Sequence, residues 1–237
     1  MPRILSEYRV FFGQFWRAYH TTGAISPSSR WLAAALARYV PEGQGTRHIL
    51  EVGPGTGAVT QSIVRNLRPS DRLDLVELNE TFVAALRERF RNDPEFAAVA
   101  DRAEVIHRSV EDLPQSPTYD AIVSGLPLNN FSTDLVERLV RAFGNLLKPG
   151  GTLSFFEYVA VRPARAAVSG RADKKRLREI GGVLGKLFAA GEFRRECVLR
   201  NFPPAWVHHV RFDGTNGEAA HGAAGCPVDT GPTTDLR

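Results

Sequence analysis

Residues 49–60 read Ile49-Leu50-Glu51-Val52-Gly53-Pro54-Gly55-Thr56-Gly57-Ala58-Val59-Thr60, and they carry the strongest structural signal of this 237-residue chain. The apolar residues before Gly53 indicate a short buried strand, and Ala58 opens a segment with helical spacing. A glycine loop between a strand and a helix lets a ligand approach backbone N–H groups without interference from Cβ atoms. This stretch predicts a strand at 48–52, a ligand-binding loop and a helix at 58–67.

Glu77 supplies the second half of this signal. It closes the next apolar strand, predicted at 72–77, and lies 20 residues beyond Gly57. An acidic side chain at this place can accept hydrogen bonds from both hydroxyls of a ribose. A plain glycine turn in an α/β protein is the alternative, but the order of strand, loop and acidic residue favours a nucleoside site. Nicotinamide-binding folds more often show Gly-x-Gly-x-x-Gly, whereas the third glycine here comes one residue earlier.

Hydrophobic periodicity on both sides of this unit predicts alternating strands and helices. We expect helices at about 3–20, 30–39, 58–67, 79–91, 132–147 and 165–190, and strands at 48–52, 72–77, 104–107, 119–124, 152–161, 194–200 and 206–212. This order predicts an α/β fold with a seven-stranded, mostly parallel sheet and helices on both faces. Lys148-Pro149-Gly150-Gly151 is expected to form a turn.

The same pattern divides the chain into three parts. We expect an N-terminal amphipathic helix and loop at 1–30, one domain at 31–212 with a basic insertion at about 162–190, and a disordered tail at 213–237. The tail is expected to be disordered because it is rich in Gly, Ala, Thr and Pro and offers little apolar surface.

Composition gives only broad limits. The chain has 30 Lys and Arg against 26 Asp and Glu, a net charge of +4 and 43% hydrophobic residues. Cys197 and Cys226 form no metal or redox motif, and no histidine spacing suggests metal ligands, so we expect no metal site. His208 and His209 should point to opposite faces of a strand. No apolar run approaches the roughly 20 residues of a spanning helix, and no secretory signal is evident, so a cytoplasmic, soluble or peripheral protein is expected.

The spacing Glu51-x-Gly53-x-Gly55-x-Gly57 resembles motif I of class I S-adenosylmethionine-dependent methyltransferases, and Glu77 matches their acidic ribose-binding residue. The resemblance implies their Rossmann-like fold, S-adenosyl-L-methionine as cofactor and S-adenosyl-L-homocysteine as product. It implies a cofactor site made of Glu51, Gly53, Gly55, Gly57, Glu77, Leu78, Val110, Glu111 and Ser124. Many family members carry an acidic residue where this chain has Ser109, so adenine contact is expected from Val110, Glu111 or backbone groups.

The loop after the fourth strand, Ser124-Gly125-Leu126-Pro127-Leu128, bears on the substrate. Methyltransferases that act on adenine amino groups usually have Asn or Asp, then Pro, then an aromatic residue that stacks on a flipped base. Gly125 stands at the amine-binding position and Leu128 at the aromatic one. Both departures argue against a base and favour a slimmer, more apolar site.

This loop, together with Thr22-Gly23-Ala24-Ile25-Ser26-Pro27-Ser28-Ser29-Arg30 and Phe202-Pro203-Pro204-Ala205-Trp206-Val207, resembles the bacterial phospholipid N-methyltransferases. The resemblance implies methylation of phosphatidylethanolamine to its mono-, di- and trimethylated forms. An ornithine-containing lipid is the first alternative, because it also presents a small primary amine. An RNA adenine methyltransferase, a small-molecule methyltransferase and a non-catalytic membrane-binding protein are the others.

Two segments have the composition of a membrane-contacting surface. The predicted first helix combines an apolar and aromatic stripe with cations, and its candidate contacts are Arg3, Arg9, Phe11, Phe12, Trp16 and Arg17. Bulky rings and cations suit the interface of an anionic bilayer, although the helix could instead only cap the cofactor pocket. The basic stretch from 162 to 200 supplies further candidates for a lipid phosphate: Arg171, Lys174, Lys175, Arg176 and Arg178. A solvated helix face is the alternative.

Together these features predict peripheral binding to the inner face of the cytoplasmic membrane, an anionic lipid surface as partner, and no nucleic acid. A lipid amine with a pKa of about 10 must lose a proton before it can accept a methyl group. Tyr8, Tyr19 and Tyr158 are the candidates for orienting or deprotonating it, with Glu157 nearby in sequence. Amphipathic packing is the alternative role for each tyrosine.

Overall fold

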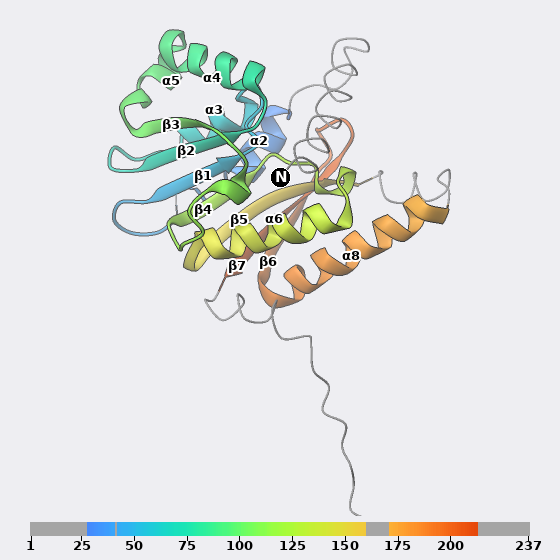
Figure 1. Cartoon of the computed structure of the whole chain (residues 1–237). Coiled ribbons are helices and arrows are strands. Elements are labelled where there is room, and N and C mark those ends of the chain that lie inside the picture. Colours follow the sequence, from blue (N-terminus) through green and yellow to red (C-terminus); the bar gives the residue numbers. More distant parts are fainter. Residues whose placement is uncertain (1–27, 41, 160–170, 213–237) are drawn as a thin grey trace, which may run out of the picture.

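Seven strands in the described part of the chain form one sheet in the order β3-β2-β1-β4-β5-β7-β6 (Figure 1). The computed structural model describes residues 28–40, 42–159 and 171–212. The strands are β1 (His48–Val52), β2 (Arg72–Glu77), β3 (Ala103–His107), β4 (Tyr119–Ser124), β5 (Leu147–Tyr158), β6 (Glu192–Val198) and β7 (Ala205–Phe212). The helices are α2 (Arg30–Leu36), α3 (Ala58–Val64), α4 (Glu80–Asn92), α5 (Pro94–Ala97), α6 (Thr133–Leu146) and α8 (Arg171–Gly191), with short 3₁₀ turns η1 (Ala100–Arg102), η2 (Val110–Asp112) and η3 (Leu128–Asn130).

Strand direction places one functional edge on this sheet. β1 pairs in parallel with β2 on one side and with β4 on the other, and β5 continues the parallel run. β7 is antiparallel to both β5 and β6, so β6 runs in the same direction as β5. The carboxyl ends of β1 to β6 therefore meet at one edge, and the strand order reverses at β1, where ligands bind in open α/β sheets.

The core consists of two apolar layers, one on each face of the sheet. On one face, Leu50 and Val52 of β1 belong to a cluster with α6 and α8. On the other face, Ile49 belongs to a cluster with α2, α3, α4 and α5. Because successive side chains of a strand alternate between faces, Glu51 lies on the same side as Ile49. The apolar run of β1 thus supplies both layers, as expected for a parallel strand covered on both faces.

Most predicted elements are confirmed, and β1, β2 and β4 have the predicted bounds. α2 and α3 each end three residues earlier than predicted, because the chain tightens into turns in which Val40 N–H donates to Ala37 O and Asn66 N–H to Ile63 O. α5 and the three 3₁₀ turns were not predicted. The predicted helix at 3–20, the loop up to 27 and the tail at 213–237 lie outside the described residues.

The predicted turn at Lys148–Gly151 is wrong in one respect. β5 already begins at Leu147, which pairs with Tyr119 of β4, and the next paired residues are Ala121 and Thr152. β4 thus advances by two residues while β5 advances by five, so the Pro-Gly-Gly segment is an irregularity inside the strand. Gly150 allows it because its φ of 78° favours glycine.

α8 is an integral part of the covering layer, although residues 171–190 were expected to belong to an inserted basic segment. Its inner face buries Leu177, Ile180, Leu184 and Leu187, which recur at intervals of three and four residues. Figure 1 shows α8 beside α6 on the same face of the sheet. Within the described ranges, no helix has an apolar stretch long enough to cross a bilayer.

Candidate functional site

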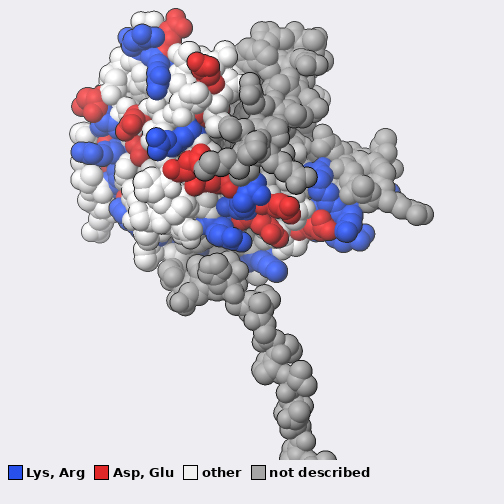
Figure 2. Space-filling view, viewed as in Figure 1, with Lys and Arg blue, Asp and Glu red and all other residues white. Residues whose placement is uncertain are grey.

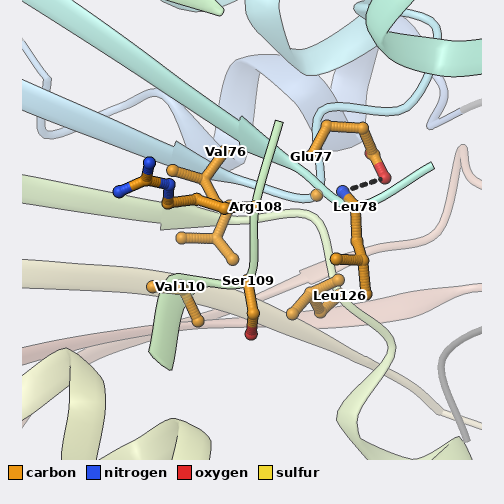
Figure 3. Close-up of a pocket in the computed structure, with 9 residues that line it drawn as sticks. Val76, Glu77, Leu78, Arg108, Ser109, Val110 and Leu126 are labelled. Atoms are coloured by element: carbon orange, nitrogen blue, oxygen red, sulfur yellow. Dashed lines mark hydrogen bonds between the residues drawn. The ribbon is translucent and has the colours of Figure 1, made fainter. Parts of the chain in front are cut away.

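A small pocket opens at the carboxyl edge of the sheet, where β1, β2, β3 and β4 end (Figure 3). It is lined by Val52, Gly53, Val76, Glu77, Leu78, Arg108, Ser109, Val110 and Leu126. Four of these residues, Gly53, Glu77, Leu78 and Val110, were predicted from the sequence. The others immediately flank the predicted strand ends, and this position was the signal that could have identified them.

The glycine loop after β1 is shaped by close packing at one end and open space in the middle. Gly53, Gly55 and Gly57 all have positive φ, between 57° and 87°. A Cβ on Gly53 would lie 2.5 Å from Leu126 Cδ2, whereas a Cβ on Gly55 would meet no atom within 4 Å. The loop therefore leaves its backbone accessible at Gly55, as a cofactor-binding loop requires.

Glu77 holds this loop in place. Its Oε1 accepts hydrogen bonds from the N–H groups of Leu78 and Asn79, both at 2.8 Å, and its Oε2 accepts one from Gly55 N–H at 3.1 Å. Figure 3 shows the Glu77 carboxylate beside Leu78 at the pocket wall. Burial raises the pKa of the Glu77 carboxyl, and these backbone donors partly oppose the shift. The carboxylate keeps acceptor capacity for ribose hydroxyls on Oε2.

Glu51 has the most unusual environment of the predicted residues. It is fully buried, and in the described part of the chain neither carboxylate oxygen has a hydrogen-bond partner. The nearby Thr60 hydroxyl favours the charged form but does not reach hydrogen-bond geometry with it. Burial raises the pKa of Glu51 to about 8. A buried carboxylate without a partner is costly, so this position suits a cationic group of a ligand.

Directly after β4, the backbone at Gly125 passes close to the end of β1 and the glycine loop. Gly125 N–H donates to Val52 O at 2.8 Å, and a Cβ on Gly125 would lie 2.6 Å from Gly53 O. A side chain at this position would push β4 away from the glycine loop. The absence of Asn or Asp here therefore has a structural cause as well as the predicted functional one.

Several predicted contacts take other roles in the structure. Ser124 is fully buried and its hydroxyl accepts a hydrogen bond from Leu126 N–H at 3.3 Å. Glu111 pairs with Arg138 of α6 at 2.9 Å. Gly57 is the N-cap residue of α3, and a Cβ there would crowd Arg89, at 3.0 Å from its Nη1. None of the three lines the described pocket.

Leu128 also differs from its predicted role as the counterpart of a stacking aromatic residue. It is 1% exposed and belongs to the core cluster beneath α6. Leu126 instead supplies the apolar wall of the pocket (Figure 3). Leu126, rather than Leu128, thus supplies the apolar surface that was predicted for the segment after β4. Ser109 is buried at the pocket, where its hydroxyl caps η2 by accepting from Glu111 N–H at 3.4 Å.

Tyr158 ends β5 at the same edge of the sheet, packed edge-on against Phe156. Burial raises the pKa of its hydroxyl, so it stays protonated at neutral pH and is a poor base. Its neighbour Glu157 is buried and lies 3.5 Å from His208 Nε2. His208 and His209 do point to opposite faces, as predicted: His208 stacks on Phe155, and His209 bonds with Ser154 Oγ at 2.8 Å. The other catalytic candidates, Tyr8 and Tyr19, lie outside the described residues.

The predicted phosphate contacts on α8 fall into two groups. Arg176 is engaged internally, because its Nη1 donates to Asn129 O at 3.0 Å and to Phe131 O at 2.7 Å. Lys174, Lys175 and Arg178 are exposed. Figure 2 shows basic and acidic residues interspersed over α6 and α8.

The remaining membrane candidates are not placed. The side chain of Arg171 lies outside the described part of the chain, as do Arg3, Arg9, Phe11, Phe12, Trp16 and Arg17. Across the described ranges, no cluster of three His, Cys, Asp or Glu side chains is arranged to hold a metal ion.

Comparison with known sequences identifies relatives that are methyltransferases, in agreement with a cofactor pocket at the end of β1. The chain matches the family described as a methyltransferase domain over residues 49–151. It is 31% identical over 156 residues to an ornithine lipid N-methyltransferase of Singulisphaera acidiphila, an alignment that covers 63% of this chain and 77% of the relative. It is 30% identical over 143 residues to ribosomal RNA small subunit methyltransferase A of Parasynechococcus marenigrum, covering 60% of this chain but 42% of that relative.

Solved structures share the fold. The O-methyltransferase TomG from Streptomyces achromogenes, in complex with SAM, is 18% identical with a TM-score of 0.53, covering 77% of this chain and 79% of that one. An O-methyltransferase from Bacillus cereus, in complex with SAH, is also 18% identical with a TM-score of 0.53, covering 87% and 90% of the two chains.

Proposed function

Because this chain belongs to the class I S-adenosylmethionine-dependent methyltransferases, we propose that it transfers the methyl group to the amine of a membrane lipid head group. The observation that carries this proposal is the likeness to an ornithine lipid N-methyltransferase, which spans 77% of that relative. The three segments that resemble phospholipid N-methyltransferases support the same substrate class. Two of them meet in the fold: Ser29 N–H donates to Asn201 Oδ1 at 3.0 Å, next to Phe202.

The described residues fit S-adenosylmethionine. The open side of Gly55 admits the ligand to the loop, and Glu77 can accept ribose hydroxyls. The unpartnered carboxylate of Glu51 suits the ammonium of the cofactor's amino-acid tail. Val110 and Leu126 provide apolar walls for a ring. When bound, this cofactor supplies a methyl group activated by a sulfonium.

The protein's part in the reaction is to orient the amine toward the methyl group and to exclude water from both. The attacking nitrogen must be neutral and in line with the departing sulfur, and fixed orientation in a dry site can lower the barrier by several kcal/mol. Tyr158 lies on the correct edge, but its raised pKa makes it a hydrogen-bonding partner of the amine rather than the group that removes the proton. We expect that proton to leave before the amine enters the apolar site.

Two lipids meet these requirements. Phosphatidylethanolamine is favoured by the sequence segments, and an ornithine lipid is favoured by the identified relative. The test is to incubate the protein with labelled S-adenosylmethionine and anionic vesicles that contain one or the other lipid. Label in mono-, di- or trimethylated product identifies the substrate and the number of transfers. Absence of label from both lipids, with cofactor binding intact, would refute the proposal.

RNA is the second candidate, because ribosomal RNA methyltransferases are among the relatives. The close approach of Gly125 to Gly53 O argues against it, since the usual Asn or Asp could not be accommodated without moving the backbone. The same labelling assay with RNA as acceptor separates the two classes. Label in adenine of RNA and none in lipid would favour the second candidate.

A further inference from the structure

The turn between β6 and β7 exposes large apolar side chains beside the pocket edge. Leu199 is 75% exposed and Phe202 is 81% exposed, and Trp31 at the start of α2 is 38% exposed. Water-exposed aromatic and aliphatic side chains on neighbouring segments mark contact surfaces more often than isolated exposed residues do. We call these three residues, with Arg30 and Arg200, the turn patch.

Cations surround the apolar residues of this patch. The Arg30 guanidinium lies 3.9 Å from the centre of the Trp31 ring, and that of Arg200 lies 5.4 Å from it. Arg195 likewise lies over Trp206, at 4.9 Å. In the described part of the chain, none of these arginines has an acidic partner. Aromatic rings at head-group depth combined with unpaired cations are typical of surfaces that bind anionic lipid.

The patch is held rigidly at the carboxyl edge of the sheet. Ser29 N–H donates to Asn201 Oδ1, and Asn201 Nδ2 donates to Pro203 O at 2.7 Å, so the turn and the start of α2 are tied together. Val159 N–H, after β5, donates to Pro204 O at 2.8 Å. The turn thus lies at the carboxyl edge of the sheet, next to the ends of β5 and β6 (Figure 1).

We propose that the turn patch inserts into the interface of an anionic lipid bilayer and holds the pocket edge of the protein against the membrane. Leu199 and Phe202 enter the head-group and acyl boundary, while Arg30 and Arg200 face lipid phosphates. This inference rests on the proposed function, which requires the pocket to reach a lipid head group without extracting the whole lipid into water.

The test uses the full chain and vesicles of phosphatidylglycerol and phosphatidylcholine, which contain no primary amine. The double variant Leu199→Ser with Phe202→Ser should partition into these vesicles at least about tenfold more weakly, because two apolar side chains no longer leave water. The matched control is Phe193→Ser, which removes a 40% exposed ring at the start of β6, at the opposite edge. Unchanged binding of the double variant, or an equal loss in the control, would overturn the proposal.

A second measurement reports insertion directly. With Trp16→Phe and Trp206→Phe, Trp31 is the remaining tryptophan, and bromine-labelled acyl chains should quench its fluorescence. Unquenched Trp31 on bound protein would overturn the proposal, as would a full chain that binds no vesicles. The outcome is independent of catalysis. If the unaltered chain binds vesicles but labels no lipid, and the double variant loses vesicle binding, the proposed function alone is refuted. Lipid methylation with unchanged binding of the double variant would refute the turn patch alone.

Discussion

The buried, unpartnered carboxylate of Glu51 costs stability, and we expect it also to bind the ligand. Its pKa of about 8 in the fold exceeds the ordinary value of 4.5, so the folded state binds more protons than the unfolded one between these values. Stability from this group is therefore present at low pH and is lost as pH rises from 4.5 to 8. Glu51→Gln should thus raise the free energy of unfolding by roughly 2–4 kcal/mol above pH 8, with little effect near pH 5.

The same variant should weaken binding of S-adenosylhomocysteine by about tenfold or more, because an amide cannot pair with the ligand ammonium. Denaturant unfolding at several pH values and calorimetric titration measure the two effects. Glu137→Gln on the exposed side of α6 is the matched control and should change neither. Equal stability of Glu51→Gln and the unaltered chain at pH 8 would contradict the assignment of a buried, unpartnered carboxylate.

Substitution of Gly125 tests the close contact between the end of β4 and the glycine loop. Gly125→Ala places a Cβ 2.6 Å from Gly53 O, so the backbone must shift. We expect the free energy of unfolding to fall by about 1–3 kcal/mol and cofactor binding to weaken with it. Gly182→Ala on α8 is the control: its Cβ meets no atom within 4 Å, and alanine should stabilise the helix by up to about 1 kcal/mol. Tolerance of Gly125→Ala in both measurements would show that this contact can relax.

Among the elements, α8 carries both an internally bonded arginine and exposed cations, so the contributions of packing and of surface charge to stability can be measured separately. Arg176→Gln removes donors to two carbonyls of the η3 segment, and should destabilise the protein by about 1–3 kcal/mol. The combined variant Lys174→Gln, Lys175→Gln and Arg178→Gln should change stability by less than about 0.5 kcal/mol, because these side chains are exposed. Thermal unfolding distinguishes the two. If the triple variant also binds anionic vesicles as well as the unaltered chain, these three cations do not contribute to membrane binding.

Local pattern was sufficient for elements whose boundaries are set by their own residues. β1, β2 and β4 are short apolar runs ended by glycine or polar residues, and their bounds were predicted. β5 was not, because its first residues pair with β4 through an irregularity that only tertiary contact defines. The 3₁₀ turns are too short to show a period.

The candidate site shows the same division. Glu77 and Gly53 were identified because motif spacing fixes their place at strand ends. Glu111 was assigned to the cofactor site and Leu128 to the position of the family's aromatic residue. Leu128 packs in the core beneath α6, and the Glu111 side chain pairs with Arg138. Which way a loop side chain points depends on a helix that follows later in the chain, and spacing alone does not contain that information.

Considered as one body, the protein presents its pocket, the start of α2 and the β6–β7 turn at one edge, so a membrane would be met from one side. The N-terminal residues 1–20, with their aromatic and basic composition, are separated from α2 in sequence by residues 21–29. Deleting them should strongly weaken binding to anionic vesicles if they form the predicted interfacial helix, because its aromatic anchors and cations are lost together and only the turn patch remains. Vesicle flotation measures this directly.

The deletion also decides between the two roles that the sequence allows for these residues. An interfacial helix predicts loss of vesicle binding with S-adenosylhomocysteine affinity unchanged, since Glu51, Glu77 and the glycine loop remain. A helix that only caps the cofactor pocket predicts the reverse: weaker affinity for the ligand and unchanged flotation. Loss of both would mean that one segment performs both roles, and the Leu199→Ser and Phe202→Ser variant then reports how much of the vesicle binding comes from the turn patch. Unchanged flotation and unchanged ligand affinity after deletion would contradict both roles.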